Sequence, residues 1–216
     1  MTIRKISLLA GFCLAVITAN AQLLGESAKQ VYKAPGYKDS LEQHKIVAIL
    51  PFKSTISYKR MPKKFDAEAN AAEEKKLGLN MQQGMFTYLL RKGGKYSVSF
   101  QDIERTNVLL RQAGILDKLD EILPDSIAKV LKVDAVIRCT YAYEKTGSEA
   151  GAIVSTMLIG SGKTGSGSLT MQINEGSDGL LLWRFYKEMN ENFTSNANQL
   201  MERMMRKVSR NFPYEK

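Results

Sequence analysis

The sequence contains few of the residues on which catalytic and metal sites most often depend. Its 216 residues include one histidine and two cysteines. With His44 alone, the chain offers no multi-histidine zinc site and little basis for a histidine-dependent catalytic triad, and we expect His44 to be a surface residue. Cys13 lies in the N-terminal apolar run, which leaves only Cys139 for the mature chain and excludes an intrachain disulfide or a cysteine metal cluster. Because Cys139 lies in an apolar segment, we expect its thiol to be buried and inert.

Long apolar runs are also missing. The N-terminal stretch Ile6–Ile17 is too short to cross a bilayer as a helix. It follows Arg4 and Lys5 and precedes an A-x-A site ending at Ala21, which is the anatomy of a secretory signal peptide. We therefore predict cleavage after Ala21 and an exported protein that is periplasmic or associated with the outer membrane. A membrane anchor is the alternative interpretation. A lipid anchor is not indicated, because Phe12 separates the Leu-Ala-Gly tripeptide from the cysteine.

Acidic residues are also fewer than basic ones, with 22 Asp and Glu against 31 Lys and Arg. The chain carries a formal net charge of +9 at pH 7, and such an excess favours anionic partners. In an exported protein these would be acidic lipid headgroups, lipopolysaccharide or cell-wall polymer, and we expect no nucleic-acid partner. The charges are mixed along the chain except in Lys59–Lys64 (K-R-M-P-K-K), which we interpret as a solvated basic loop.

The segment around which we expect the rest of the chain to be arranged is Lys45–Phe52 (K-I-V-A-I-L-P-F). Ile46–Leu50 is continuously apolar, and a strand that is apolar on both faces belongs in the middle of a sheet. Pro51 then ends the hydrogen-bonded ladder. The preceding residues, 22–44, are polar and irregular and are predicted to be a flexible N-terminal arm, whereas Lys53–Lys64 is predicted to be a basic loop.

Helices and further strands alternate after this loop. In the long helix, Asp66 is the expected N-cap, and Leu77, Met81, Met85 and Leu89 form a four-spaced stripe that we expect to face the core rather than a binding partner. The predicted elements are a helix Phe65–Arg91, a strand Lys95–Phe100, a helix Ile103–Ala113 capped by Asp102, a turn Asp117–Leu123, a helix Ser126–Leu131, strands Asp134–Tyr143, Ser168–Asn174 and Leu180–Met189 with a hairpin loop Glu175–Gly179, and a helix Ser195–Asn211.

This order predicts an α/β fold. Strands joined through helices are parallel neighbours and the terminal hairpin is antiparallel, so we expect a mixed sheet of about five strands flanked by helices, in the order β-α-β-α-α-β-(insert)-β-β-α. The domain organisation is then a signal peptide (1–21), the arm (22–44) and a single domain (45–214). Its Gly-rich insert, 144–167, is expected to hold a short helix and a flexible loop.

Four stretches in the same order resemble a known superfamily of bacterial envelope proteins. I-V-A-I-L-P-F is similar to its first strand, Y-S-V-S-F-Q-D-I-E-R-T-N-V-L-L-R-Q-A-G-I to its strand and helix with a D…R…L…AG pattern, A-K-V-L-K-V-D-A-V-I-R-C-T-Y to its "VDAVI" stretch, and G-L-L-L-W-R-F to its "G.LLW" motif. The superfamily holds CsgG-like secretion lipoproteins, TolB N-terminal domains and LpoB-like activators. The ending F-P-Y is similar to secreted members from Bacteroidetes-like bacteria.

The resemblance implies a non-enzymatic envelope protein that acts in assembly, secretion or scaffolding, with other envelope proteins or further copies of the chain as partners. Peripheral contact with anionic membrane or cell-wall polymer is a further expectation. The alternative function is a subunit of a CsgG-like outer-membrane channel, with Ala150–Ile159 as its membrane element. That segment lacks the alternation of a lipid-facing strand, and Glu175–Gly179 has no room for a second membrane hairpin of about 9–11 residues per strand.

Two patterns invite an enzymatic interpretation that the spacing does not support. Gly160–Thr164 (G-S-G-K-T) lacks the earlier glycine of a nucleotide-binding P-loop, since that position is Met157, and we interpret it as a flexible loop. Carboxylates group at helix starts and in turns, where solvated charge is the simplest explanation and an envelope hydrolase is the alternative: Glu68, Glu73, Glu74, Asp117, Asp120, Glu121 and Asp125. For Asp117, Asp120 and Glu121 a second alternative is calcium ligation. No G-x-S-x-G elbow is present. We therefore predict no catalytic residues, no metal site and no cofactor.

Overall fold

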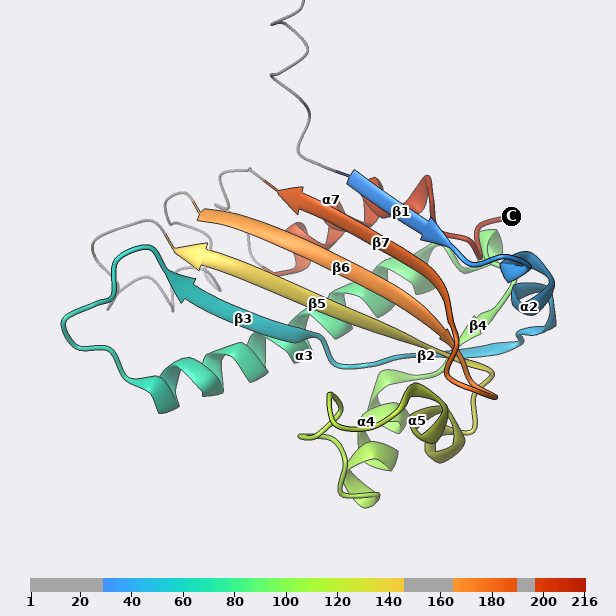
Figure 1. Cartoon of the computed structure of the whole chain (residues 1–216), viewed down its shortest axis with the longest axis horizontal. Helices are drawn as coiled ribbons and strands as arrows, with labels where there is room; N and C mark the ends of the chain where they lie inside the picture. Colours follow the sequence, from blue (N-terminus) through green and yellow to red (C-terminus); the bar gives the residue numbers. More distant parts are fainter. Residues whose placement is uncertain (1–28, 146–164, 190–196) are drawn as a thin grey trace, which may run out of the picture.

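The computed structural model describes residues 29–145, 165–189 and 197–216 (Figure 1). The expected signal peptide and the first residues of the expected arm lie outside these ranges. So do Ala150–Ile159 and Gly160–Thr164, which make up most of the insert that we predicted at 144–167.

One mixed sheet holds seven strands in the described part of the chain, so the α/β class is confirmed with more strands than the five expected. Its order is β1-β7-β6-β5-β2-β4, and β3 pairs with β5 beyond the end of β2. The pairs of β2 with β4, β2 with β5 and β3 with β5 are parallel, and β5–β6, β6–β7 and β1–β7 are antiparallel. The strands are β1 (Lys29–Lys33), β2 (Ile46–Ile49), β3 (Lys53–Tyr58), β4 (Ser99–Phe100), β5 (Ala135–Lys145), β6 (Gly165–Glu175) and β7 (Leu181–Met189).

Strand β2 is buried on both faces, as its continuous apolar run predicted. Val47 and Ile49 pack into the larger core cluster, and Ala48 and Leu50 pack into a second cluster on the opposite face. Two corrections apply. Ile46, at the start of the run, is 43% exposed, and the strand with the most neighbours is β5, which pairs with β2, β3 and β6.

The first half of the expected basic loop is instead strand β3. Pro51 interrupts the ladder, but the chain rejoins the sheet at Lys53 and pairs with β5 through Tyr58. Ser54 and Ile56 are buried on the inner side while their neighbours are exposed, but Ser54 is polar, so the sequence does not show the apolar alternation of a strand here. Lys59–Lys64 is exposed or nearly so, which confirms the solvated loop for that part.

Residues 29–44 are folded, which corrects the prediction of a flexible arm for this part of 22–44. Strand β1 pairs antiparallel with β7 along its whole length. Gly36 takes a left-handed turn with φ 70°, and helix α2 (Tyr37–Gln43) follows and buries Leu41. The arm therefore supplies an edge strand whose partner lies about 150 positions further along the chain.

Helices α3 (Ala67–Arg91) and α7 (Ala197–Ser209) cover one face of the sheet (Figure 1). Asp66 caps α3 as predicted, since its carboxylate accepts hydrogen bonds from the backbone N–H groups of Glu68 and Ala69. The stripe predicted to face the core in α3 is buried: Leu77, Met81, Met85 and Leu89. In α7 the buried side chains are Leu200, Met201, Met204, Met205 and Val208, followed by Phe212. Each helix is thus held by one apolar stripe on the sheet.

One glycine of α3 allows the helix to approach the sheet closely. A Cβ built on Gly78 would lie 2.2 Å from the backbone oxygen of Phe52, and the Phe52 N–H donates to the Gly78 carbonyl at 3.3 Å. Any larger residue would push α3 away from the junction of β2 and β3.

On the other face, α4 (Ile103–Gln112) and α5 (Pro124–Leu131) lie at one end of the sheet, where they pack on β2, β5 and β6. Asp102 is the N-cap of α4 as predicted, and α5 begins two residues before the predicted Ser126, with Pro124 in its first turn. Strand β4 is shorter than the predicted Lys95–Phe100, because a 3-10 turn occupies Gly93–Lys95. No helix in the described ranges is long and apolar enough to cross a membrane.

Candidate functional site

Most of the sheet has one face that no described helix covers. Figure 1 shows α3 and α7 behind β3, β5, β6 and β7, with α4 and α5 confined to the end of the sheet near β2. We call the uncovered side the open sheet face. Alternate residues of five strands point to it, and their side chains are exposed or half-buried: Gln30 and Tyr32 of β1, Lys53, Thr55 and Ser57 of β3, Arg138, Thr140, Ala142 and Glu144 of β5, Ser168, Thr170 and Gln172 of β6, and Arg184, Tyr186 and Glu188 of β7.

The strand register places these residues in continuous rows. Gln30 lies opposite Tyr186, Tyr186 opposite Thr170, Thr170 opposite Thr140, and Thr140 opposite Lys53. Residues directly opposite each other share a face of the sheet. At a strand spacing of about 4.8 Å this row is about 19 Å long, so the open sheet face is broad enough to contact a folded partner rather than a single small group.

The open sheet face combines many short polar side chains with a few large ones. Short hydroxyl and amide side chains from β5 and β6 form its middle, and Tyr32, Arg184 and Tyr186 stand along one side. Tyr32 is 48% exposed, and the Tyr186 hydroxyl donates to Glu188 Oε1 at 3.0 Å. Tyrosine and arginine are the residues that most often contribute binding energy at interfaces. A hollow of about 350 Å³ between Ser57, Glu144 and Tyr186 could receive one partner side chain.

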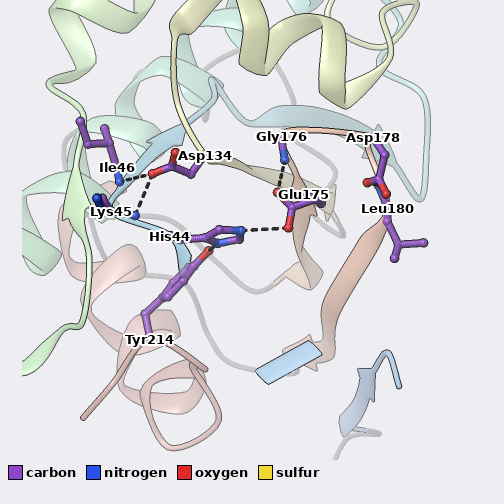
Figure 2. Close-up of polar contacts among 9 residues, drawn as sticks. All are labelled: His44, Lys45, Ile46, Asp134, Glu175, Gly176, Asp178, Leu180 and Tyr214. Carbon is purple, nitrogen blue, oxygen red and sulfur yellow. Dashed lines mark hydrogen bonds and ion pairs between the residues drawn. The ribbon is translucent and has the colours of Figure 1, made fainter. Parts of the chain in front are cut away.

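A second polar cluster lies at the end of the sheet where β6 turns into β7 (Figure 2). His44 is only 5% exposed, which corrects the prediction of a surface histidine. Its Nδ1 lies 2.7 Å from the Tyr214 hydroxyl oxygen and its Nε2 lies 3.0 Å from Glu175 Oε2. Since a carboxylate only accepts, Nε2–H donates to Glu175 and Nδ1 accepts from the Tyr214 hydroxyl in the neutral ring. Burial raises the pKa of Tyr214, which keeps that hydroxyl protonated.

Asp134 fixes the start of β2 in the same cluster. Its Oδ2 accepts from the backbone N–H groups of Lys45 at 2.7 Å and Ile46 at 2.8 Å. Burial opposes ionisation of this carboxyl, but the two backbone donors and the neighbouring Lys45 and His44 outweigh it and lower the pKa of Asp134. The carboxylates are thus bound to groups of the protein itself, and no group of three metal-ligating side chains occurs among the described residues. We therefore interpret the cluster as structural. We call His44, Asp134, Glu175 and Tyr214 the clasp, because their hydrogen bonds hold separate segments of the chain together.

The other carboxylates considered as acids or calcium ligands are paired with basic groups or bonded to the fold. Asp117 lies 2.7 Å from Lys75 Nζ and Asp120 lies 2.6 Å from Lys53 Nζ, all four side chains being more than half exposed. Asp125 pairs with Lys129 at 3.0 Å within α5. Glu68 and Glu121 are exposed. The solvated-charge interpretation fits these two residues, Asp117 and Asp120, whereas the Asp125 side chain is only 19% exposed.

Glu73 and Glu74 of α3 are exceptions, because they bond to the sheet. Glu74 Oε1 accepts from the Ile56 N–H at 2.7 Å, and Asn70 reaches the Ile56 carbonyl at 3.5 Å. These contacts occupy the free edge of β3. Glu73 lies 3.8 Å from Lys145 Nζ at the end of β5, where Lys145 is only 4% exposed.

Sequence reasoning missed both the open sheet face and the His44 cluster. The alternation of Ser168, Thr170 and Gln172 was visible, but nothing local shows that Thr140 and Tyr186 stand beside them. Cys139, by contrast, is buried as expected, and burial raises the pKa of its thiol.

No protein-family model and no curated protein matches this sequence. Among solved structures, the chain is similar to the lipoprotein GNA1162 from Neisseria meningitidis, with a TM-score of 0.44 and 12% identity over 77% of this chain and 95% of that one. It is also similar to the PelC dodecamer from Paraburkholderia phytofirmans, with a TM-score of 0.41 and 13% identity over 88% and 97% of the two chains. The LpoB C-terminal domain from Escherichia coli gives a TM-score of 0.34 and 10% identity over 73% and 100%. Likenesses this distant assign neither a family nor a function.

Proposed function

We propose that this chain is an exported, non-catalytic protein of the bacterial cell envelope that acts in assembly, secretion or scaffolding by binding other proteins through the open sheet face. The observation that carries the proposal is the register of that face. Five strands align one row of hydroxyl, amide, tyrosine and lysine side chains. Such a surface is wide and mostly polar, and transient protein interfaces are likewise no more apolar than the rest of a protein surface.

The sheet pattern itself argues for a partner-binding role over an enzymatic one. Side chains of the open sheet face are supplied by strands, which hold them rigidly and spread them out. Catalysis instead needs a few reactive groups brought together in a cleft. Glu144 of β5 and Glu188 of β7 both line the hollow of about 350 Å³, but β6 lies between their strands, and the other side chains that line it are small or aromatic.

Export is supported by the N-terminal sequence. The anatomy of a signal peptide ending at Ala21, together with the resemblance to CsgG-like, TolB-like and LpoB-like envelope proteins, favours a periplasmic or outer-membrane-associated location. The partners expected there are other envelope proteins or further copies of this chain.

The proposal is tested by the size of the protein in extracts of its native host. We expect the wild-type chain to elute as part of a larger assembly after membranes are washed with carbonate and opened with mild detergent. The double substitution Arg184→Ser and Tyr186→Ser removes two large side chains from the open sheet face and should shift the protein toward its monomeric size. The control Lys63→Ser and Lys64→Ser alters two exposed residues of the basic loop and should leave the assembly intact.

Two results would overturn the proposal. The first is a wild-type protein that elutes as a monomer in every fraction. The second is an assembly whose size is unchanged by the Arg184→Ser and Tyr186→Ser double variant.

A further inference from the structure

Six basic side chains from three elements converge on a hollow at the edge of the molecule, on the side of the sheet opposite the open sheet face. We call it the basic hollow. It has a volume of about 570 Å³ and is lined by Lys29, Lys187, Arg203, Arg206, Lys207, Arg210 and Asn211. Figure 1 shows its elements together, with α7 running behind β7 and β1.

The sequence of α7 and of the turn that follows it explains four of these residues. Arg203, Arg206 and Lys207 of α7, and Arg210 directly after its end, follow the spacing i, i+3, i+4, i+7, which favours one side of a helix. Met204 and Val208, between them, are buried against the sheet. The packing of the apolar stripe therefore orients the basic stripe toward the edge strands.

Strands β1 and β7 supply the opposite wall. Lys29 and Lys187 are direct partners in the β1–β7 ladder, and like charges facing each other across a ladder are unfavourable. Their pair lies on the inner side of the sheet, since the adjacent partners Val31 and Phe185 pack in the core. A bound anion would relieve this repulsion.

Part of the charge of the basic hollow is compensated within the protein. Glu202 Oε1 accepts from Arg206 Nη2 at 3.3 Å, but the same carboxylate also pairs with Arg91 of α3, so one negative charge serves two guanidinium groups. No carboxylate lines the hollow among the residues that the structure describes. A concave surface with charge of one sign concentrates the electrostatic field and raises the local concentration of counter-ions.

We propose that the basic hollow is a binding site for phosphate groups that carry two or more negative charges together. Guanidinium groups bind phosphate oxygens in pairs of parallel hydrogen bonds, and ammonium groups add point charges without demanding one geometry. The hollow supplies both kinds of group, from a helix and from two strands. Its volume is within the range of small-ligand sites, about 300–1,000 Å³. The phosphate can belong to a lipid headgroup or to a soluble molecule, and either would occupy the same cations.

This site is independent of the proposed protein-binding function, because it lies on the other side of the sheet and shares no lining residue with the open sheet face. A negative result for phosphate binding would therefore not contradict protein binding through the open sheet face, and the reverse also holds.

The test uses the mature chain and two probes at low ionic strength. Inorganic tripolyphosphate, titrated by calorimetry, represents soluble phosphate. Vesicles of phosphatidylglycerol in phosphatidylcholine, assayed by sedimentation, represent lipid headgroups, with pure phosphatidylcholine as the neutral reference. Binding to either probe should weaken as salt is raised, since screening shortens the reach of the charges.

The informative variant is Lys29→Gln with Arg210→Gln, because both side chains are exposed and they come from opposite walls of the hollow. Each lost charge should weaken binding about fivefold, so the double variant should bind about 10- to 30-fold more weakly. The control, Lys63→Gln with Lys64→Gln, removes the same charge from the exposed basic loop and should bind within about twofold of wild type.

The outcomes are distinct. Binding of tripolyphosphate alone, lost in the double variant, assigns a soluble phosphate ligand. Binding of the anionic vesicles, with or without tripolyphosphate and lost in the same variant, assigns a lipid headgroup. If neither probe binds, or if the control loses as much affinity as the Lys29→Gln and Arg210→Gln variant, the site does not exist.

Discussion

His44 and Tyr214 lie 170 positions apart in the sequence, yet His44 Nδ1 is 2.7 Å from the Tyr214 hydroxyl oxygen. The same imidazole donates to Glu175 through Nε2. One buried ring thus connects the segment before β2, the β6–β7 hairpin and the C-terminal residues.

Tyr214→Phe should lower the free energy of unfolding by about 1 kcal/mol, since it removes one hydrogen bond and leaves the His44 nitrogen without a partner. His44→Ala should cost more, about 2–4 kcal/mol, because it also leaves a hole and two unpartnered side chains. Urea unfolding followed by tryptophan fluorescence measures both. The matched control is Tyr32→Phe, whose hydroxyl lies on a side chain that is 48% exposed. Equal stabilities of the Tyr214→Phe and Tyr32→Phe proteins would contradict this account of the clasp.

Gly78→Ala tests how closely α3 approaches the sheet. The added Cβ would lie 2.2 Å from the Phe52 oxygen, so helix and sheet must separate, at a cost of about 1–3 kcal/mol or more. Gly94→Ala is the control, since a Cβ there meets nothing within 4 Å. The helix propensity of alanine alone would stabilise the Gly78→Ala protein by up to about 1 kcal/mol. A stabilised Gly78→Ala protein in thermal unfolding would therefore show that the approach is looser than described.

Glu74→Ala tests the protection of the β3 edge. The carboxylate of Glu74 accepts from the Ile56 N–H and also holds Asn70 in place at 3.1 Å. Without it, an edge strand with a free backbone donor becomes available for pairing with another chain. We expect faster aggregation in light scattering near the unfolding temperature, together with a loss of about 1–2 kcal/mol in stability. Glu68→Ala, in the first turn of the same helix, should aggregate at the wild-type rate, and matching rates for all three proteins would be the opposing result.

Asp134 predicts a pH dependence of stability. Its pKa is lower in the folded protein than the ordinary value of 3.8. The unfolded chain therefore takes up this proton first as the pH falls, and the stability that Asp134 contributes is present above about pH 4 and lost as the pH falls through the folded-state pKa. In Asp134→Asn the acid limb of a plot of unfolding free energy against pH should be shallower. Identical limbs in the two proteins would show that Asp134 makes no such contribution.

Local sequence patterns predicted the helices well, because helix caps and apolar stripes are formed by residues that are close together in the sequence. The cap at Asp66 and the stripe from Leu77 to Leu89 were predicted from the sequence and are confirmed. The hairpin of β6 and β7 was legible for the same reason, although an irregularity in the ladder brings Leu182 into the core rather than Leu181.

Elements defined by distant partners were missed. Strand β1 is short and polar, and it is a strand only because β7 lies beside it. In β3 a buried serine, Ser54, takes an inward position that an apolar residue would have marked. The burial of His44 depends on three separated segments. The open sheet face and the basic hollow depend on register and on the packing of α7, neither of which a local pattern contains.

The most direct test of the central claim is photo-crosslinking in the native host from a probe placed at Thr140, in the middle of the open sheet face. A probe at Lys76, exposed on α3 behind the sheet, is the reference. The account predicts an adduct of defined mass from Thr140, which the Arg184→Ser and Tyr186→Ser double variant abolishes and which Lys76 does not give. If Thr140 gives no adduct, or the same adducts as Lys76, the open sheet face is not a binding surface.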